Sequence, residues 1–206
     1  MAAAQTTLLI VAPLRAERDP LRRELERLDA PPQAIRVERL GVGRDQTLRN
    51  LNAWVQRLAP QKIVLFGSCG WIAETPYAPG RLFAIDRAID GNNPQRIARC
   101  DEAWTGALCA ALDLPRENIV TTNDGVIDSS VARQLYHATH APLVDMETYH
   151  AAAWCAERGI SFAALRAVTD PAGANAENTF HQNLHTVMTT AAKKIAPILS
   201  SISAQS

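Results

Sequence analysis

The sequence predicts an α/β domain, in which buried strands alternate with amphipathic helices along the chain. Short apolar runs such as 6–12, 62–66 and 162–168 are typical of buried strands. Between them, apolar residues recur at helical spacing, most clearly over 179–200. No internal repeat, low-complexity stretch or linker divides the sequence, so we expect residues 1–206 to form a single domain.

The first helix is expected to begin at Asp19, which can cap it, with Pro20 at its first position, and to end before Pro31 and Pro32. A second helix should follow the turn 41–43 and bury one apolar face. In this half of the chain, strands are predicted at 6–12, 34–40, 62–66 and 81–89. The alternating Arg and Glu residues of 34–40 place that strand near an edge of the sheet. The glycines of 67–70 are expected to end the strand 62–66.

The second half of the sequence continues the alternation. Helices are predicted at 101–112, 129–137, 147–158 and 179–200, and Gly159 should close the third of them. Strands are predicted at 118–122, 142–146 and 162–168. The order of these elements is that of a layered α/β domain.

Composition excludes several classes of protein. The chain balances 21 Lys and Arg against 21 Asp and Glu, without a basic stripe, which argues against a nucleic-acid partner and favours a small molecule or a protein. None of the four cysteines forms a C-x-x-C pair, so we expect reduced thiols in a cytoplasmic protein. The apolar run 8–12 is too short for a signal peptide or a membrane span.

Two acidic motifs directly follow apolar runs. They are Val144-Asp145-Met146-Glu147 and Arg166-Ala167-Val168-Thr169-Asp170-Pro171. In an open α/β sheet, ligands bind at the carboxyl ends of the strands, where these side chains should lie. Paired carboxyl groups suit a reaction with a cationic transition state and a leaving group that must be protonated. Cleavage of the bond between a sugar and a nucleobase is such a reaction.

These motifs, with Gly67-Ser68-Cys69-Gly70, resemble in order and spacing three signatures of the nucleoside phosphorylase and nucleosidase superfamily. The resemblance spans residues 6–200. The family includes purine nucleoside phosphorylases, methylthioadenosine/adenosylhomocysteine nucleosidases and phosphorylase-like enzymes of hopanoid synthesis. It implies a three-layer α/β/α fold with a mixed central sheet, and a homodimer or larger homo-oligomer in which a neighbouring subunit often completes the site.

The resemblance also implies roles for the acidic motifs. Asp170 would donate a proton to purine N7, Glu147 would bind the ribose hydroxyls and offset positive charge on the sugar, and Met146 would pack beneath the ribose. Each has a purely structural alternative: a turn residue, a carboxylate at a helix N-terminus and a core side chain. Asp145 would assist Glu147 or accept hydrogen bonds from backbone amides. Arg166 would orient Asp170 or pair with another acid.

Two residues near the first strand point to different nucleophiles. Arg15 lies in a segment that resembles a phosphate-binding segment of phosphorylases, and Ser68 would be a second phosphate contact. Glu17 falls where nucleosidases carry a Glu that activates water. All three also fit ordinary polar turns. Some bacterial phosphorylases have a further phosphate-binding Arg where this chain has Leu65, and this difference favours hydrolysis.

The base is expected to meet the segment 123–128, which resembles the purine-binding segment of nucleosidases and places Val126 and Ile127 at the base. Val126 replaces an aromatic residue there, so stacking would need a ring from elsewhere. We expect no cofactor and no metal: Gly41-Val42-Gly43 lacks the third glycine of a dinucleotide fingerprint, and His181 and His185 lack the Glu of an H-E-x-x-H motif. Cys69 is expected to be a packed thiol.

The sequence therefore predicts an enzyme that cleaves the N-glycosidic bond of a purine nucleoside, most simply by hydrolysis. One alternative is a phosphate-dependent phosphorylase, including the hopanoid-associated type. The other is a nucleoside-binding relative without catalysis. The base, the 5′ substituent and the oligomeric state stay open.

Overall fold

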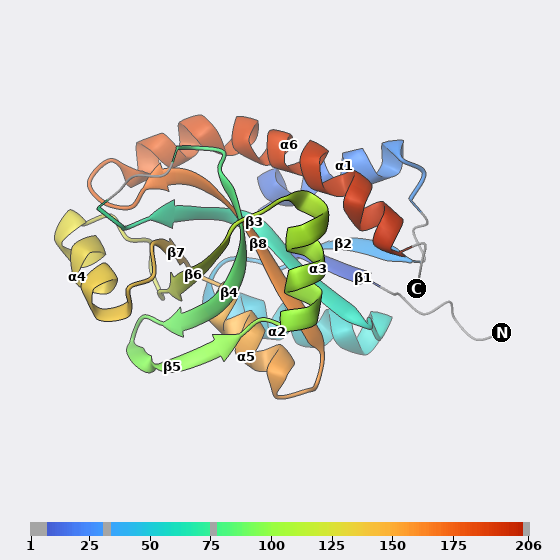
Figure 1. Ribbon diagram of the computed structural model, residues 1–206, viewed down its shortest axis with the longest axis horizontal. Coiled ribbons are helices and arrows are strands. Elements are labelled where there is room, and N and C mark those ends of the chain that lie inside the picture. The colour runs from blue at the N-terminus through green and yellow to red at the C-terminus, as the bar shows by residue number, and fades with distance from the viewer. Residues whose placement is uncertain (1–7, 31–33, 75–77, 204–206) are drawn as a thin grey trace.

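The strands and helices of the chain follow the predicted alternation (Figure 1). The structure is a computed structural model that describes residues 8–30, 34–74 and 78–203. Within these ranges the elements are β1 (Leu8–Ala12), α1 (Arg15–Arg27), β2 (Ile35–Arg39), α2 (Gly43–Leu58), β3 (Lys62–Trp71), β4 (Leu82–Asp90), β5 (Asn93–Arg99), α3 (Glu102–Leu112), β6 (Arg116–Thr121), α4 (Ser129–Thr139), β7 (Leu143–Asp145), α5 (Thr148–Ala156), β8 (Ser161–Pro171) and α6 (Ala176–Ser203).

The strands form one mixed sheet. Strands β2, β1, β3 and β8 pair in parallel, and β2 lies at an edge, as its charged residues predict. Strand β8 continues antiparallel to β4, β4 and β7 both pair in parallel with β6, and β7 returns antiparallel to β3. The pairings β3–β8–β4–β6–β7 therefore close into a ring, with β5 added outside β4.

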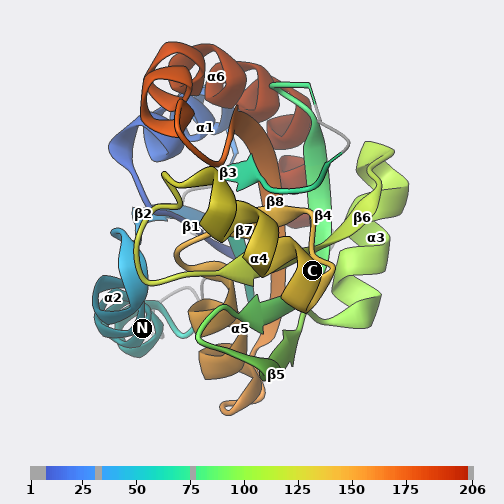
Figure 2. The same ribbon diagram turned by 90° about the vertical axis from the view of Figure 1, so that its left-hand side faces the viewer.

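Helices cover both faces of this sheet, which confirms the fold class. One core cluster joins α1, α3 and α6 to the strands, and a second joins α2 and α5 to the opposite face. Figure 2 shows α6 and α1 above the sheet and α2 and α5 below it. Of the helices described, none is long and apolar enough to cross a membrane.

Helix α1 begins at Arg15 and not at Asp19, so the predicted start is wrong. The reason is Glu17, whose Oε2 accepts a hydrogen bond from the backbone N–H of Leu14 at 2.8 Å and so closes the first turn. Pro20 lies at the sixth helical position, where its ring removes one backbone donor near the helix start. The predicted stop at Pro31 and Pro32 lies outside the described residues.

Strands β3 and β8 are both longer than predicted. β3 continues through the glycine motif to Trp71, and β8 continues through Asp170 to Pro171, because the two strands pair along nearly their whole lengths. Glycine is required at Gly67, since a Cβ there would lie 2.4 Å from Nη1 of Arg166. Strand β5 was not predicted, because its mostly exposed polar residues show no apolar alternation.

Candidate active site

A cavity of about 350 Å³ lies where β1, β3, β6, β7 and β8 end. This is where ligands are expected in an open α/β sheet. Its wall combines the loop after β1, the start of α2, the segment 122–127 and the first turns of α6 with these strand ends. All predicted site residues except Arg15 line it: Glu17, Ser68, Val126, Ile127, Asp145, Met146, Glu147 and Asp170.

Asp170 is the acidic side chain on β8, and it is only 8% exposed. Burial raises the pKa of its carboxyl to about 6. The hydrogen bond from the Thr169 hydroxyl at 2.7 Å acts in the opposite direction and lowers the pKa, but its effect is smaller. Gly70 lets the neighbouring strand come close, because a Cβ there would lie 3.1 Å from Oδ2 of Asp170. A carboxyl group with a raised pKa and no cationic partner among the described residues can act as a proton donor.

Arg166 is fully buried and joins the other acidic groups. Its Nη2 pairs with Asp145 and lies 3.3 Å from Oε2 of Glu147, while Nη1 donates to the backbone carbonyl of Ser68 at 3.3 Å. Its Nε donates to the Thr148 hydroxyl at 3.1 Å. Of the two expectations for Arg166, pairing with other acids is therefore the one observed.

The carboxylate of Asp145 is held entirely by protein groups. Oδ1 accepts a hydrogen bond from the Thr121 hydroxyl at 2.7 Å, and Oδ2 accepts one from the backbone N–H of Thr148 at 3.1 Å, in addition to the Arg166 pair. The expected bond to a backbone amide is thus present. This arrangement favours a supporting role for Asp145 over direct contact with a ligand.

Glu147 forms the N-cap of α5 and is 4% exposed. Oε1 accepts a hydrogen bond from the backbone N–H of Gly43 at 3.0 Å, which the positive φ of Gly43 allows. Burial raises the pKa of Glu147, whereas the charge of Arg166 lowers it. Its carboxylate is therefore oriented by two donors at the cavity wall, beside the half-buried Met146.

Glu17 and Ser68 form a bonded pair at the other side of the cavity. They come from α1 and β3, so neither lies in the ordinary polar turn that was its structural alternative. The Ser68 backbone N–H and hydroxyl donate to Oε1 of Glu17 at 2.8 and 2.6 Å. Burial raises the pKa of Glu17, and the hydrogen bonds from Ser68 lower it. A buried carboxyl group held in this way can accept a proton from a bound water.

The structure does not bring Arg15 to the cavity. It is the exposed first residue of α1. Leu65, which stands where some bacterial phosphorylases have a further phosphate-binding Arg, is buried in the core. Among the described residues that line the cavity there is no Arg or Lys. Cys69 does line it, but burial raises the pKa of this thiol, so it fits the expected packed cysteine.

The wall expected to hold a base is apolar. Val126 and Ile127 both line it, and the backbone carbonyl of Val126 is tied to the N–H of Gly173 at 3.0 Å. Phe180 of α6 lines the same cavity and can supply the ring that Val126 lacks. The helical periodicity of 179–200 predicts a buried apolar face but no cavity contact for Phe180. Its spacing of three from Glu177, which also lines the cavity, places both side chains on one face of α6, and this was the available signal.

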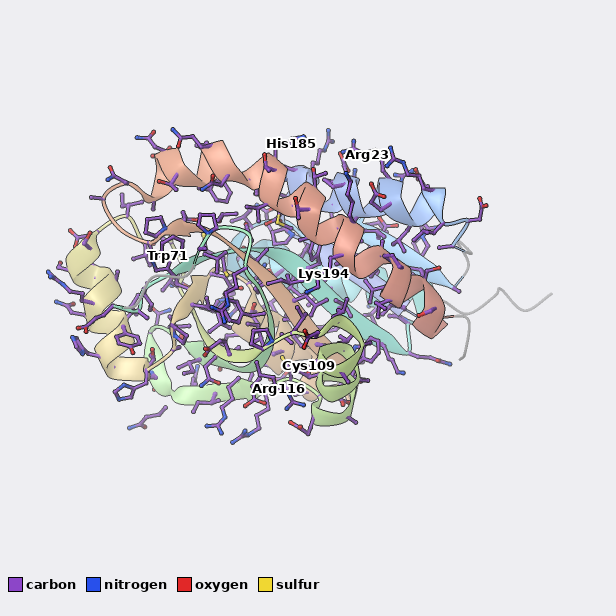
Figure 3. The ribbon with its side chains drawn as sticks, turned by 45° about the horizontal axis from the view of Figure 1, so that its top comes forward. Arg23, Trp71, Cys109, Arg116, His185 and Lys194 are labelled. Carbon is purple, nitrogen blue, oxygen red and sulfur yellow. The ribbon has the colours of Figure 1, made fainter. Side chains whose placement is uncertain are left out.

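Thr169 is a second site residue that the sequence did not single out, although it stands next to Asp170 in the motif. Both histidines of α6 are exposed, but His181 lines the cavity whereas His185, labelled in Figure 3, does not. The described part of the chain contains no group of three His, Cys, Asp or Glu residues that could hold a metal ion.

Fold and site together define an α/β protein with buried carboxyl groups around a cavity at the strand ends. The chain belongs to the Phosphorylase superfamily, whose family model matches residues 33–204. Membership confirms the family resemblance and the expectation of an enzyme of the N-ribosyl hydrolase or nucleoside phosphorylase class. No curated protein sequence matches the chain.

Solved structures with the same fold include two Helicobacter pylori proteins. Futalosine hydrolase has a TM-score of 0.85 at 16% identity, covering 95% of this chain and 98% of its own. The 5′-methylthioadenosine/S-adenosylhomocysteine nucleosidase has a TM-score of 0.86 at 15% identity, covering 96% and 99%. The S-adenosylhomocysteine nucleosidase of Streptococcus pyogenes has a TM-score of 0.85 at 20% identity, covering 98% and 99%. These structures show that the chain shares its fold with proteins of this group.

Proposed function

We propose that the protein hydrolyses the N-glycosidic bond of a purine nucleoside, as a nucleosidase of the methylthioadenosine/adenosylhomocysteine type. The observation that carries the proposal is the charge of the cavity. Asp170, Glu147 and Glu17 line it, and no Arg or Lys does among the described residues. Such a site stabilises a sugar cation and disfavours a phosphate dianion.

The reaction divides among the three carboxyl groups. The bond between the anomeric carbon and the base nitrogen breaks, its electron pair leaves with the base, and Asp170 gives a proton to that base. Glu147 accepts hydrogen bonds from the ribose hydroxyls and offsets the positive charge on the sugar. A water attacks the anomeric carbon and transfers a proton to Glu17. Protonation and electrostatic stabilisation supply the acceleration, so the proposal includes no cofactor.

The substrate pocket favours an apolar substituent. Ile127 is 67% exposed at the cavity mouth, and Phe180 and Ala176 lie on the same cavity wall. An exposed large apolar side chain at a cavity is typical of a surface that meets an apolar ligand group. A methylthio group fits this chemistry.

We also propose a homodimer or larger homo-oligomer, which gel filtration with light scattering would test.

Phosphorolysis is the competing reaction. It would need a cationic phosphate site, but Arg15 lies outside the cavity and the Ser68 hydroxyl is engaged by Glu17. A lipid-linked nucleoside would also suit an apolar mouth, and a nucleoside-binding protein would release no base. These alternatives become outcomes of one assay.

The assay measures free base by chromatography from methylthioadenosine, adenosylhomocysteine, adenosine and inosine, with and without phosphate. Release without phosphate is expected, and it should be lost in Asp170→Asn. The matched control is Asp113→Asn, the same change at an exposed residue with a left-handed conformation that Asn tolerates. Release that requires phosphate would establish the phosphorylase instead. No release from any of the four nucleosides would overturn the proposal for simple nucleosides.

A further inference from the structure

Thr169 is the extra residue of a bulge in β8. In the pairing of β3 with β8, Cys69 faces Val168 and Gly70 faces Asp170, so Thr169 has no partner residue on β3. Successive side chains of a regular strand point to opposite faces, and a bulge re-aims one of them. This irregularity accounts for the position of the Thr169 hydroxyl, 2.7 Å from Oδ1 of the adjacent Asp170.

The Thr169 hydroxyl has two oxygen neighbours but only one hydrogen. Besides Asp170, it lies 3.2 Å from the backbone carbonyl of Cys69. The side chain is fully buried, so water does not compete for this hydrogen. A hydroxyl group donates one hydrogen bond, and both neighbours are acceptors when Asp170 is ionised. The protonation state of Asp170 therefore decides which oxygen is the better acceptor.

We propose that Thr169 is a positioning residue whose hydroxyl changes hydrogen-bond partner with the protonation of Asp170. While Asp170 is neutral, the hydroxyl donates to the Cys69 carbonyl. When Asp170 gives its proton to the leaving base, Oδ1 gains negative charge, and the hydroxyl turns to donate to it. A hydrogen bond to a charged acceptor is about twice as strong as a neutral one, so the turn stabilises Asp170 as its proton leaves. The catalytic part of this inference rests on the proposed function.

The surroundings of Thr169 leave rotation of its hydroxyl as the simplest change. Asn183 of α6 donates from Nδ2 to the Thr169 carbonyl at 2.8 Å and anchors the backbone. The Cys69 carbonyl belongs to β3, which is paired on both sides. The proton to be donated can reside on Oδ2 of Asp170, which accepts no hydrogen bond from the residues that the structure describes.

Thr169 is also the one described side chain that hydrogen-bonds Asp170. The other ionisable groups that line this cavity are Glu17 of α1, Cys69 of β3, Asp145 of β7, Glu147 at the start of α5, and Glu177 and His181 of α6. In the described structure, none of them forms a hydrogen bond or an ion pair with Asp170. Removal of the Thr169 hydroxyl should therefore act directly on Asp170.

The test compares Thr169→Val, which keeps the shape but loses the hydroxyl, with Thr169→Ser, which keeps the hydroxyl. Carboxyl carbons of aspartate are labelled with ¹³C, the Asp170 signal is assigned by its absence in Asp170→Asn, and its pKa is read from a titration. We expect a higher pKa of Asp170 in the Val variant, because its carboxylate has lost a donor, and a pKa close to that of the wild type in the Ser variant. An unchanged pKa in the Val variant would overturn the inference, whatever the activity.

The same variants are then assayed for base release across pH 4.5–9. In Thr169→Val, kcat should fall about 10- to 100-fold, which is the effect of one hydrogen bond to a charged group. The alkaline limb of the profile should move to higher pH, and KM should change little. A fall in kcat shared by the Ser variant, without movement of the limb, would indicate packing alone. The two proposals can fail separately. If the pKa of Asp170 rises in Thr169→Val but the wild-type protein releases no base, the hydrogen-bond switch is retained and the proposed function is rejected.

Discussion

The hydroxyl of Ser68 and the carboxylate of Glu17 lie 2.6 Å apart, and the backbone N–H of Ser68 donates to the same Glu17 oxygen at 2.8 Å. The other Glu17 oxygen accepts from the N–H of Leu14 at 2.8 Å. Glu17 is thus fixed at the cavity wall by a helix turn and a strand that are distant in sequence. The same contacts engage the Ser68 hydroxyl that a phosphorylase would direct to phosphate.

Glu17→Gln should abolish most of the hydrolytic activity. The amide has nearly the same shape, but it cannot take a proton from water, and general-base catalysis is typically worth about 10²- to 10⁴-fold. We expect kcat for base release to fall by at least about 100-fold, with an unchanged circular dichroism spectrum. A variant with the full rate in phosphate-free buffer would show that Glu17 does not activate the nucleophile.

The pH dependence of kcat/KM should be bell-shaped. Asp170 must carry a proton to protonate the base, and burial raises its pKa to about 6, so activity should fall as pH rises through this value. Glu17 must be ionised to accept a proton, so activity should also fall on the acid side. Initial rates at low substrate over pH 4–9 would test this. If kcat/KM stayed unchanged up to pH 8, this would contradict the role of Asp170 as the acid.

Asp170→Asn should stabilise the fold at neutral pH although it removes activity. The folded protein favours the neutral acid, because the pKa of Asp170 is raised from 3.8 to about 6. In the wild type, the stability that the neutral Asp170 carboxyl group contributes is fully present below about pH 4 and is lost as pH rises through about 6. Asn does not titrate, so the variant does not lose it. The variant should gain up to about 3 kcal/mol over the wild type between pH 4 and 7.5. Urea unfolding at both pH values measures this gain, and an equal difference at the two would contradict the burial of a neutral acid.

Gly67→Ala should damage both stability and activity. The added Cβ would lie 2.4 Å from Nη1 of Arg166 and 3.1 Å from Oε1 of Glu17, so the buried guanidinium would have to move from its acidic partners. We expect a loss of about 1–3 kcal/mol, as for other overpacked core positions, and slower base release. The control is Gly106→Ala in α3, where the nearest atom is Nη2 of Arg116, at the end of a flexible side chain. Gly106→Ala should leave the free energy of unfolding unchanged or raise it. Equal losses of stability in both variants would contradict the requirement for glycine at Gly67.

Much of the fold could be predicted from local patterns. Apolar runs and helical periodicity identify the strands and helices because burial acts on each segment separately. The positions of Asp170 and Glu147 at the cavity follow from such patterns, since both residues come at the carboxyl ends of strands. Strand β5 was missed because its residues are mostly exposed and polar, and its pairing with β4 is a tertiary effect.

The site itself depends on strand pairing that periodicity does not contain. Arg166 faces Gly67 in the β3–β8 register, and only this pairing brings its guanidinium to Asp145 and Glu147. The bulge at Thr169 arises from the same pairing. Phe180 reaches the cavity because α6 packs across β8, which its own amphipathic pattern does not specify.

The most direct test of the account identifies the sugar product. The substrate that performs best in the base-release assay is turned over in buffer with excess phosphate, while ³¹P NMR follows phosphate esters and chromatography follows the base. The account predicts base and free sugar in equal amounts, no sugar 1-phosphate, and the same rate when phosphate is omitted. Sugar 1-phosphate formed in step with the base, and no turnover without phosphate, would contradict hydrolysis and make phosphate the nucleophile.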